Sequence, residues 1–348
     1  MAQNGINENK SLLLSIIVPV YNTEERYLER CLSSIGSFTR GVEVIIVDDG
    51  SAWDTALYLQ HLVASLTTPH VLLKRENGGQ NSARNMGIEA ARADYVMFLD
   101  SDDFLDTEAL HKLMDKLRKT RPQLLGFNYR RVDEAGNSLK SYDLFGSSKD
   151  KVERAAVVQH TASLCTYAYR RDLFADGYRL VENVHVGEDL ASVVPLVLRA
   201  EPLMGCDLIV YNYVQRKSSV THTYNSAVAF DILGAFDALL SRLDKAETAA
   251  FHDEIEWLCI LHVIYFGSKR AIDSGLGDRT NLMKLRSYVD SRFPDWYDNQ
   301  ILARELEARN QGFRLLINGH FKTYMILHLF KQTASRLKSI RAEGPNNE

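Results

Sequence analysis

The sequence predicts an α/β fold, in which a mostly parallel, Rossmann-like sheet is flanked by helices and followed by a helical C-terminal domain. Three observations support this prediction. Apolar strands alternate with amphipathic helices in the first part of the chain, the loops between them are short, and strand patterns vanish after about residue 226. Such alternation is typical of a parallel sheet with helices on both faces.

The first four strands are expected at 12–18, 42–47, 70–74 and 95–99, with helices at 25–37, 54–66 and 82–92 between them. Each strand is rich in apolar residues and runs into a polar or glycine-rich segment. The carboxyl ends of parallel strands meet at one edge of a sheet, which is where ligands bind in such folds. The four polar segments are therefore expected to lie together.

The alternation weakens after residue 105, which indicates a mixed second half of this domain. We expect helices at 106–120 and 151–164, strands at 123–131, 167–171 and 206–213, and a hairpin turn at 133–137. Gly187-Glu188-Asp189 opens an apolar helix at 191–198. Pro195 is expected to interrupt that helix or to sit in its first turns.

A domain boundary is expected near 224–227, where long amphipathic helices at 228–243, 249–272 and 282–292 replace the strands. The prediction is an α/β domain at 12–224 and a helical domain at 225–340. The polar ends at 1–11 and 341–348 are predicted to be disordered.

The bulk composition narrows the class of protein. The chain has 348 residues, of which 45% are apolar and 25% charged, and a net charge of −4 gives no reason to expect nucleic acid as a partner. The four cysteines are too widely spaced for a zinc site or a disulfide framework. No stretch approaches the roughly 18 apolar residues of a membrane span, and the N-terminus shows no secretory signal, so we expect a cytoplasmic protein.

Three carboxylates, Asp100, Asp102 and Asp103, follow the strand at 95–99. Like charges this close repel one another unless a cation neutralises them. Mn²⁺ or Mg²⁺ is the simplest such cation, because these ions prefer oxygen ligands and often bind together with a phosphate. The alternative for this segment alone is a polar turn ahead of the next helix, with Asp106 or Thr107 as the N-cap.

Six pieces of the sequence carry a family resemblance. They are Ile17-Val18-Pro19-Val20-Tyr21-Asn22, Val47-Asp48-Asp49-Gly50-Ser51, Asn77-Gly78-Gly79, Ala83-Arg84-Asn85-Met86-Gly87, Phe98-Leu99-Asp100-Ser101-Asp102-Asp103 and Gly187-Glu188-Asp189. A looser match runs from Tyr211 to Thr221. In order and spacing these pieces resemble glycosyltransferase family 2, the inverting nucleotide-sugar transferases with the GT-A fold, and its bacterial surface-polysaccharide members. The resemblance covers roughly residues 12 to 224.

The resemblance implies a set of residues for the chemistry. Asp102 is the metal ligand of the Asp-x-Asp motif, and Asp100 holds the ribose or supports the metal. Asp103 is interpreted as a helix cap rather than as a carboxylate behind the metal. Asp189 is the base that takes the proton from the acceptor hydroxyl, and Glu188 orients the acceptor or the donor sugar. The alternative for the last two is that they cap the following helix.

The resemblance also implies residues that bind the nucleotide sugar. Pro19, Val20 and Tyr21 would line the base pocket, and Asp49 would accept a hydrogen bond from an imide N–H. Uracil has this group and cytosine lacks it, which favours UDP over CDP, while thymine and guanine also carry such a group. Arg84 would pair with phosphate or with Asp48 or Asp49, unless it is an ordinary arginine of a helix surface. The remaining candidates for contacts with the nucleotide sugar are Asn77, Ser101 and Arg216, of which Arg216 would bind the diphosphate.

The C-terminal segment from Phe313 to Arg341 contains six basic residues and no acidic one, with aromatic and aliphatic residues interleaved. A basic, aromatic-rich helix of this kind can lie in a membrane interface. The alternative is a terminal helix that packs on the second domain and has a solvated basic face.

The sequence therefore predicts an inverting, metal-dependent glycosyltransferase. It would move a sugar from a nucleotide sugar, preferably UDP-linked, to a saccharide or lipid-linked acceptor in the synthesis of lipopolysaccharide, capsule or another bacterial surface glycan. A nucleotidyltransferase would need a glycine-rich, basic phosphate loop after the first strand, which Pro19-Val20-Tyr21-Asn22 is not. A non-catalytic scaffold that binds nucleotide sugars is the other alternative, and the intact Asp102 and Asp189 argue against it.

Overall fold

The computed structural model describes residues 12–36, 38, 40–145, 152–160, 163–216 and 229–342. Contacts divide the chain into two compact units. Unit 1 comprises Met1–His222 with Ala238–Leu243, and unit 2 comprises Thr223–Asp237 with Asp244–Glu348. The ends predicted to be disordered (1–11 and 343–348), the expected boundary at 224–227 and the last part of the looser family match, from 217, lie outside the described residues.

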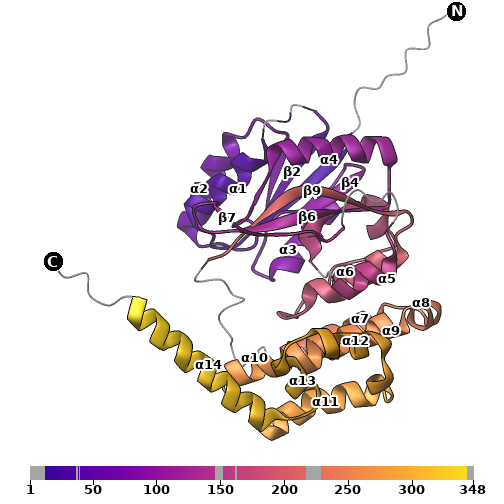
Figure 1. Ribbon diagram of the computed structural model, residues 1–348. Coiled ribbons are helices and arrows are strands. Elements are labelled where there is room, and N and C mark those ends of the chain that lie inside the picture. Colours follow the sequence, from indigo (N-terminus) through magenta and orange to yellow (C-terminus); the bar gives the residue numbers. More distant parts are fainter. Residues whose placement is uncertain are drawn as a thin grey trace, which may run out of the picture. The chain divides into compact units, whose positions relative to one another are not determined.

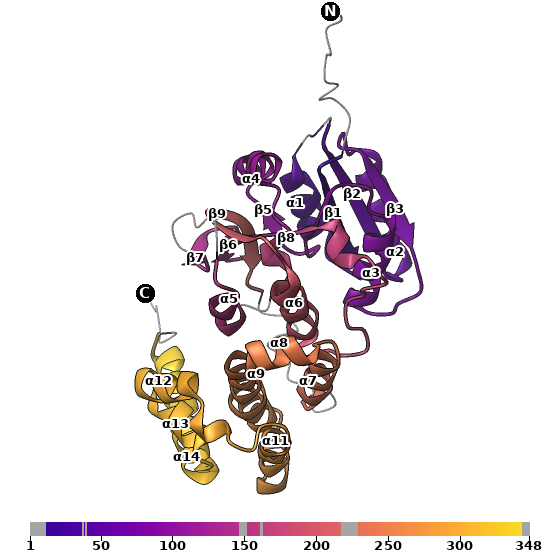
Figure 2. The same ribbon diagram turned by 90° about the vertical axis from the view of Figure 1, so that its right-hand side faces the viewer.

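Unit 1 is built on one continuous sheet with the strand order β3-β2-β1-β4-β8-β6-β9-β5, and β7 pairs with β6 (Figure 1 and Figure 2). The strands are β1 (Leu14–Val20), β2 (Val42–Asp48), β3 (His70–Lys74), β4 (Tyr95–Phe98), β5 (Phe104–Leu105), β6 (Leu124–Val132), β7 (Ser138–Tyr142), β8 (Tyr167–Arg170) and β9 (Leu203–Val214). The pairs among β1 to β4 are parallel, as predicted. β8 runs antiparallel between β4 and β6, which makes the second half of the sheet mixed.

Helices cover the two faces of this sheet. They are α1 (Glu25–Ile35), α2 (Trp53–Ala64), α3 (Gln80–Ala90), α4 (Thr107–Thr120), α5 (Arg154–His160) and α6 (Glu188–Arg199). α1 packs on α2 and α4, whereas α3 packs directly on β1 and β2. The chain moves outward from β1 to β3 and then returns to β4 on the other side of β1, so right-handed crossovers place α3 on the face opposite α1 and α2. β1, β2 and β4 are buried along their whole length as a result.

The strand order reverses between β1 and β4. In open α/β sheets, ligands bind at the carboxyl ends of the strands beside such a reversal. The loops that leave β1 and β4 are tied together there by a hydrogen bond of 2.7 Å between the hydroxyls of Thr23 and Ser101. The topology therefore brings the polar ends of the strands to one place, as the sequence predicts.

Two helix predictions were wrong in detail. The helix expected at 151–164 is shorter, with α5 over Arg154–His160 and a separate 3₁₀ turn at Leu164–Thr166. Pro195 neither interrupts α6 nor sits in its first turns, because the helix continues through it to Arg199. Residues 190–198 of α6 are all buried, so tertiary packing stabilises the helix and offsets the hydrogen bond that the proline lacks.

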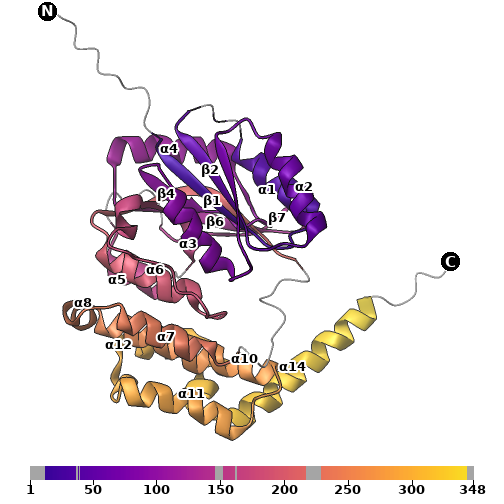
Figure 3. The ribbon, with the colours of Figure 1, turned by 180° about the vertical axis from the view of Figure 1, so that it is seen from behind.

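Unit 2 is helical, as predicted, and Figure 3 shows its helices in orange to yellow. They are α7 (Asp231–Ser241, shared with unit 1), α8 (Lys245–Ala250), α9 (His252–Cys259), a π-helical segment (Ile260–Gly267), α10 (Ser268–Asp273), α11 (Arg279–Arg292), α12 (Gln300–Ala308), α13 (Gln311–Ile317) and α14 (Phe321–Ala342). The helix expected at 249–272 is found as one uninterrupted helical run from His252 to Asp273, in which the middle part, Ile260–Gly267, is π-helical. No helix in the described part of the chain is both long and apolar enough to cross a bilayer.

The packing of α3 on the sheet leads to a first prediction. A Cβ atom at Gly87 would overlap Ile17 Cγ2 of β1, which is fully buried. Gly87→Ala should therefore lower the free energy of unfolding by about 1–3 kcal/mol, because an overpacked core must shift. Gly234→Ala in α7 is the matched control, since no atom of the described residues lies within 4 Å of its added Cβ. The control should be neutral or slightly stabilising in urea denaturation. Equal effects of the two substitutions would show that α3 does not need a glycine to pack against β1.

Candidate active site

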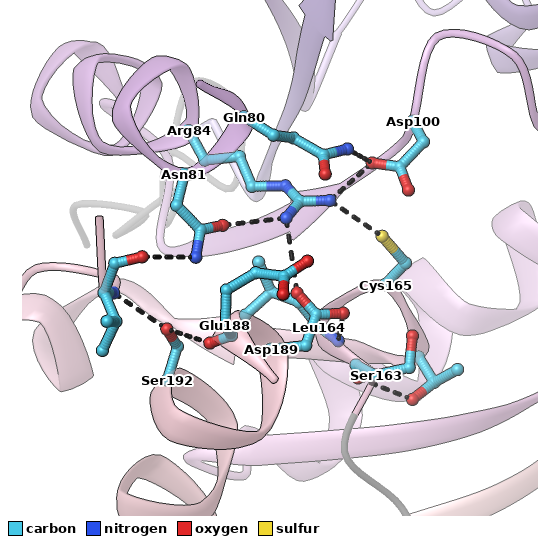
Figure 4. A network of polar contacts seen from close by, with 12 residues as sticks. Gln80, Asn81, Arg84, Asp100, Ser163, Leu164, Cys165, Glu188, Asp189 and Ser192 are labelled. Atoms are coloured by element: carbon cyan, nitrogen blue, oxygen red, sulfur yellow. Dashed lines mark hydrogen bonds and ion pairs between the residues drawn. The ribbon is translucent and has the colours of Figure 1, made fainter. Parts of the chain in front are cut away.

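The candidate active site lies where five segments of unit 1 meet. They are the loops after β1, β2, β3 and β4 and the first turn of α6. A further segment, which follows β9, reaches the same edge of the sheet, where the carboxyl ends of the parallel strands lie. At its centre is Arg84 of α3, which is 1% exposed (Figure 4). The alternative of a surface arginine was therefore wrong. The expected pairing with Asp48 or Asp49 was wrong too, because Arg84 pairs with Asp100 and Asp189 instead.

The Arg84 guanidinium joins two predicted site residues that are far apart in the sequence. Nη2 donates to Asp100 Oδ1 at 2.6 Å, and Nη1 forms an ion pair with Asp189 Oδ1 at 3.4 Å. Nη1 also donates to Asn81 Oδ1 at 2.9 Å, and the Gln80 side chain donates to Asp100 at 2.7 Å. Burial by itself would lower the pKa of Arg84, but the charges of the carboxylates outweigh it and raise that pKa. Arg84 is therefore a fixed cation.

The base candidate Asp189 is oriented from two sides. Arg84 holds Oδ1, and the backbone N–H of Leu164 donates to Oδ2 at 3.2 Å. Burial raises the pKa of Asp189, and the positive charge of Arg84 opposes that rise. Burial and the adjacent charge of Asp189 raise the pKa of Glu188 to about 7. Both carboxyls thus hold a proton more tightly than a free carboxylic acid does. The N-cap of α6 is Gly187, and the Glu188 carboxylate accepts a hydrogen bond from its own backbone N–H in the first turn.

The segment after β4 holds its three carboxylates in three different ways. Asp100 pairs with Arg84, and Asp102 forms an ion pair with Arg216. Asp103 is buried and accepts hydrogen bonds from the Tyr211 hydroxyl at 2.6 Å and from the Val214 N–H at 2.7 Å, both on β9. The interpretation of Asp103 as a helix cap was wrong. Asp106 caps α4 through Ala109 N instead, as one alternative predicted.

Asp49 is buried and shapes the loop after β3. Its oxygens accept hydrogen bonds from the N–H groups of Gly78 at 3.1 Å and Gly79 at 2.9 Å, and Arg75 forms an ion pair with it at 3.0 Å. A carboxylate offers about four lone-pair positions, of which these three contacts use about three, and the Asp49 side chain is 3% exposed. Asp48 accepts from Ser51 N, which closes the turn after β2.

The remaining predicted residues line the same edge. Pro19 and Val20 are the buried last residues of β1, Tyr21 is 54% exposed, and Asn77 is exposed in the loop after β3. Tyr21 is thus available to stack on a ligand.

Sequence reasoning missed four residues of this network. Gln80 and Asn81 precede Arg84 by four and three positions, which is the spacing of neighbours on one helix face, so the helical period could have identified them. Cys165, whose Sγ lies 3.9 Å from Arg84 Nη2, and Tyr211 come from distant parts of the chain. Only the tertiary fold reveals these two.

The loop that precedes α6 is held through its backbone. The Asn85 side chain accepts from Leu180 N at 2.8 Å and donates to Leu180 O at 3.1 Å. Asn81 Nδ2 donates to Val181 O at 2.9 Å, and the Ser192 hydroxyl accepts from Val181 N at 2.9 Å. This loop therefore has a defined path into Glu188 and Asp189, although it is neither helix nor strand.

The chemistry of the carboxylate segment fits a divalent cation. Asp100 and Asp102 offer oxygen donors of the kind that Mg²⁺ and Mn²⁺ prefer, and their side chains are 24% and 25% exposed. Another group of possible ligands, His252, Asp253 and Glu256, lies in unit 2, where Glu256 already accepts a hydrogen bond from Asn299. That group belongs to a separate part of the chain.

The fold and the strand-end carboxylates define an α/β protein of the GT-A type. Residues 15–177 match the sequence model described as "Glycosyl transferase family 2". Over these residues, which make up just under half of its length, the chain is similar to members of this family.

Named glycosyltransferases are similar to parts of this chain. The chain is 33% identical over 128 residues to an uncharacterized glycosyltransferase of Haemophilus influenzae, covering 37% of this chain and 51% of that protein. It is 24% identical over 341 residues to glycosyltransferase GlyA of Streptococcus pneumoniae, covering 94% and 47%. It is 34% identical over 152 residues to chondroitin synthase of Escherichia coli, covering 42% and 22%. The chain thus spans about half or less of the length of these relatives.

Two solved structures share the fold. Residues 1–349 of S. aureus TarS in complex with UDP superpose with a TM-score of 0.68 at 18% identity, covering 92% of each chain. The mannosyltransferase PcManGT from Pyrobaculum calidifontis, in complex with GDP-Man and Mn²⁺, gives a TM-score of 0.55 at 15% identity, covering 93% of this chain and 87% of that one.

The position of Arg84 leads to a second prediction. Arg84→Met should destabilise the protein by about 2–4 kcal/mol, because it leaves partly buried carboxylates without their cation. The pKa of Asp189 would then rise further above its value in the unfolded chain. A carboxyl with a raised folded-state pKa loses stability as the pH rises through that pKa, so the loss should be larger at pH 8 than at pH 5.

Urea denaturation of the wild type and the variant at both pH values tests this prediction. Arg118→Met is the control, since Arg118 pairs with Asp115 on an exposed surface and should cost little at either pH. If Arg84→Met lowers the free energy of unfolding equally at both pH values, the charge of Arg84 is not what stabilises the carboxylates of the site.

Proposed function

We propose that the protein is an inverting glycosyltransferase that moves a sugar from a nucleotide sugar to a hydroxyl of a saccharide or lipid-linked acceptor. One observation carries the proposal. A single buried guanidinium holds the base candidate Asp189 and the Asp-x-Asp residue Asp100 in one site, at the point where the strand order reverses. The site thus offers Asp100 of the Asp-x-Asp motif to the donor diphosphate and its metal ion, and it offers Asp189 to the attacking hydroxyl.

The proposed reaction is a single displacement. Asp189 accepts the proton of the acceptor hydroxyl while the oxygen of that hydroxyl attacks the anomeric carbon of the donor sugar. The bond between that carbon and the diphosphate oxygen breaks on the opposite face, which inverts the configuration. Asp102, supported by Asp100, would hold a Mn²⁺ or Mg²⁺ ion, which when bound stabilises the negative charge of the leaving diphosphate. Glu188 is proposed to orient the sugar hydroxyls beside the base.

We propose UDP as the nucleotide of the donor. The Asp49 carboxylate is the proposed acceptor of an imide N–H, which uracil has and cytosine lacks. Tyr21 offers an exposed aromatic face next to the buried Pro19 and Val20. The complexes of TarS with UDP and UDP-GlcNAc support the choice by analogy of fold. The similarity to chondroitin synthase supports an extracellular or surface polysaccharide as the product.

Removing the proposed base tests the mechanism. Asp189→Asn should lower kcat by about 10²–10⁴-fold, because a positioned general base contributes that much. It should leave binding of UDP in the presence of Mn²⁺ nearly unchanged, as measured by thermal shift. Asp172→Asn is the control, since Asp172 pairs with Arg170 on an exposed turn.

Two other results would revise the proposal in different ways. A large loss in Glu188→Gln with a small loss in Asp189→Asn would exchange the roles of the two carboxyls. Stabilisation of the wild type by GDP, CDP or dTDP, but not by UDP, would change the donor class and leave the base assignment intact.

We also propose that α14 contacts an anionic membrane surface, where a lipid-linked acceptor would lie. Phe321 and Tyr324 pack into the core of unit 2, whereas Ile326, Leu329 and Phe330 are 55%, 61% and 69% exposed. The last three follow the i, i+3, i+4 spacing of one helix face. The sequence of this segment is basic, which favours anionic lipids.

Vesicle co-sedimentation tests this membrane contact. A triple substitution to serine at 326, 329 and 330 should weaken binding to phosphatidylglycerol vesicles by about tenfold or more, because each apolar side chain loses burial. Met283→Ser, which removes another exposed apolar side chain of unit 2, should not weaken binding. Equal binding by the triple variant and the wild type would refute the contact.

A further inference from the structure

We infer that Arg216 is an exchangeable counter-ion of Asp102, which neutralises this carboxylate in the ligand-free protein and leaves it when a divalent cation and a nucleoside diphosphate bind together. The inference rests on the proposed function, because it assigns a nucleotide-sugar site to these residues. It adds a coupling between metal and nucleotide that the proposed function does not require.

The first step is the contact itself. Arg216 Nη2 forms an ion pair with Asp102 Oδ2, and the Asp102 side chain is 25% exposed. Asp102 is the carboxylate proposed to bind the metal, so the guanidinium and a metal ion would compete for the same oxygen atoms. Two positive charges on one carboxylate would also repel each other.

The second step is how Arg216 reaches Asp102. Asp103 accepts the Tyr211 hydroxyl and the Val214 N–H, and Gln215 N donates to Val132 O at 2.8 Å. The end of β9 is thus anchored to the same short segment that carries Asp102. Arg216 follows directly, so its backbone is positioned and only its side chain needs to move.

The third step is a comparison of the two site arginines. Arg84 is almost fully buried and contacts Asp100, Asp189 and Asn81, so moving it would leave several groups without partners. Arg216 has a single carboxylate partner among the described residues, and its side chain is 21% exposed. Within that same part of the chain its buried Nε has no hydrogen-bond partner, and its guanidinium lies 5.2 Å from the centre of the Tyr27 ring. Arg216 therefore loses little when it leaves and has an unused donor for a phosphate oxygen.

The consequence is a linkage between two ligands. When a metal ion binds alone, it displaces the Arg216 guanidinium from Asp102, and the guanidinium is left without an anionic partner. A nucleoside diphosphate supplies that anion, so each ligand should favour binding of the other. Binding of metal alone should be weak in the wild type and stronger when Arg216 is absent.

Titration of Mn²⁺ into the full chain, with free Mn²⁺ measured by electron paramagnetic resonance, tests the inference. Without nucleotide, Arg216→Met should bind Mn²⁺ about tenfold more tightly than the wild type, because a competing positive charge next to Asp102 is removed. Arg216→Lys retains the charge and should stay near the wild type. Addition of UDP should tighten Mn²⁺ binding more in the wild type than in Arg216→Met.

Arg26→Met is the matched control. Arg26 also lies over the Tyr27 ring, at 4.5 Å, but it pairs with Glu24 and Glu134 and not with Asp102. An equal gain in this control would show a general effect of charge and would overturn the inference. Unchanged or weaker Mn²⁺ binding by Arg216→Met would overturn it too. Arg216→Gln provides a second neutral variant if Arg216→Met melts at a lower temperature.

Failure of this inference can be told apart from failure of the proposed function. If the function holds and the inference does not, the wild type still binds Mn²⁺ with UDP, Asp102→Asn abolishes that binding, and the Arg216 variants show no gain for Mn²⁺ alone. If the function fails, UDP does not promote Mn²⁺ binding in the wild type and no turnover depends on Asp189.

Discussion

The guanidinium of Arg84 connects three parts of the chain that are far apart in sequence: helix α3, the loop after β4 and the first turn of α6. A cation buried to this extent is very costly unless anions and acceptors surround it. Asp100, Asp189 and Asn81 provide these partners, and the same contacts fix where the two carboxylates lie. The stability of the domain and the geometry of the site therefore depend on the same interaction. Neither carboxylate can be placed independently of α3.

Much of the fold follows from local sequence patterns. The strand at His70–Lys74 is found where it was predicted, and the parallel pairing of the first four strands follows from strand–helix alternation. The polar residues after β1 to β4, Asp100 among them, were expected at one edge of the sheet because parallel strands end there. The place of Asp189 beside them was implied by the family resemblance, whose motifs lie at strand ends, in α3 and at the start of α6.

Other features depend on contacts that no local pattern encodes. The insertion of β8 between β4 and β6 joins strands that are far apart in sequence. Asp103 resembles a helix cap in sequence, but its carboxylate accepts hydrogen bonds from a hydroxyl and an N–H of β9 instead. Pro195 remains inside a helix because the surrounding core outweighs its local preference. Arg84 could not be recognised as buried, because burial of a charge requires partners from elsewhere.

The way in which α3 holds the loop before α6 affects how this protein can evolve. The Asn85 amide binds the N–H and the C=O of Leu180, and Asn81 binds the C=O of Val181, so these two side chains recognise backbone atoms. Almost any residue can supply those atoms, apart from proline where an N–H is needed. These contacts would hold the loop in place after a change of side chain at 180 or 181, provided that the new side chain fills the core in which Leu180 and Val181 are buried. Mutation can therefore diversify the exposed positions of this loop while the asparagines of α3 stay constant, which is the separation of variable and invariant positions on which divergence of specificity depends.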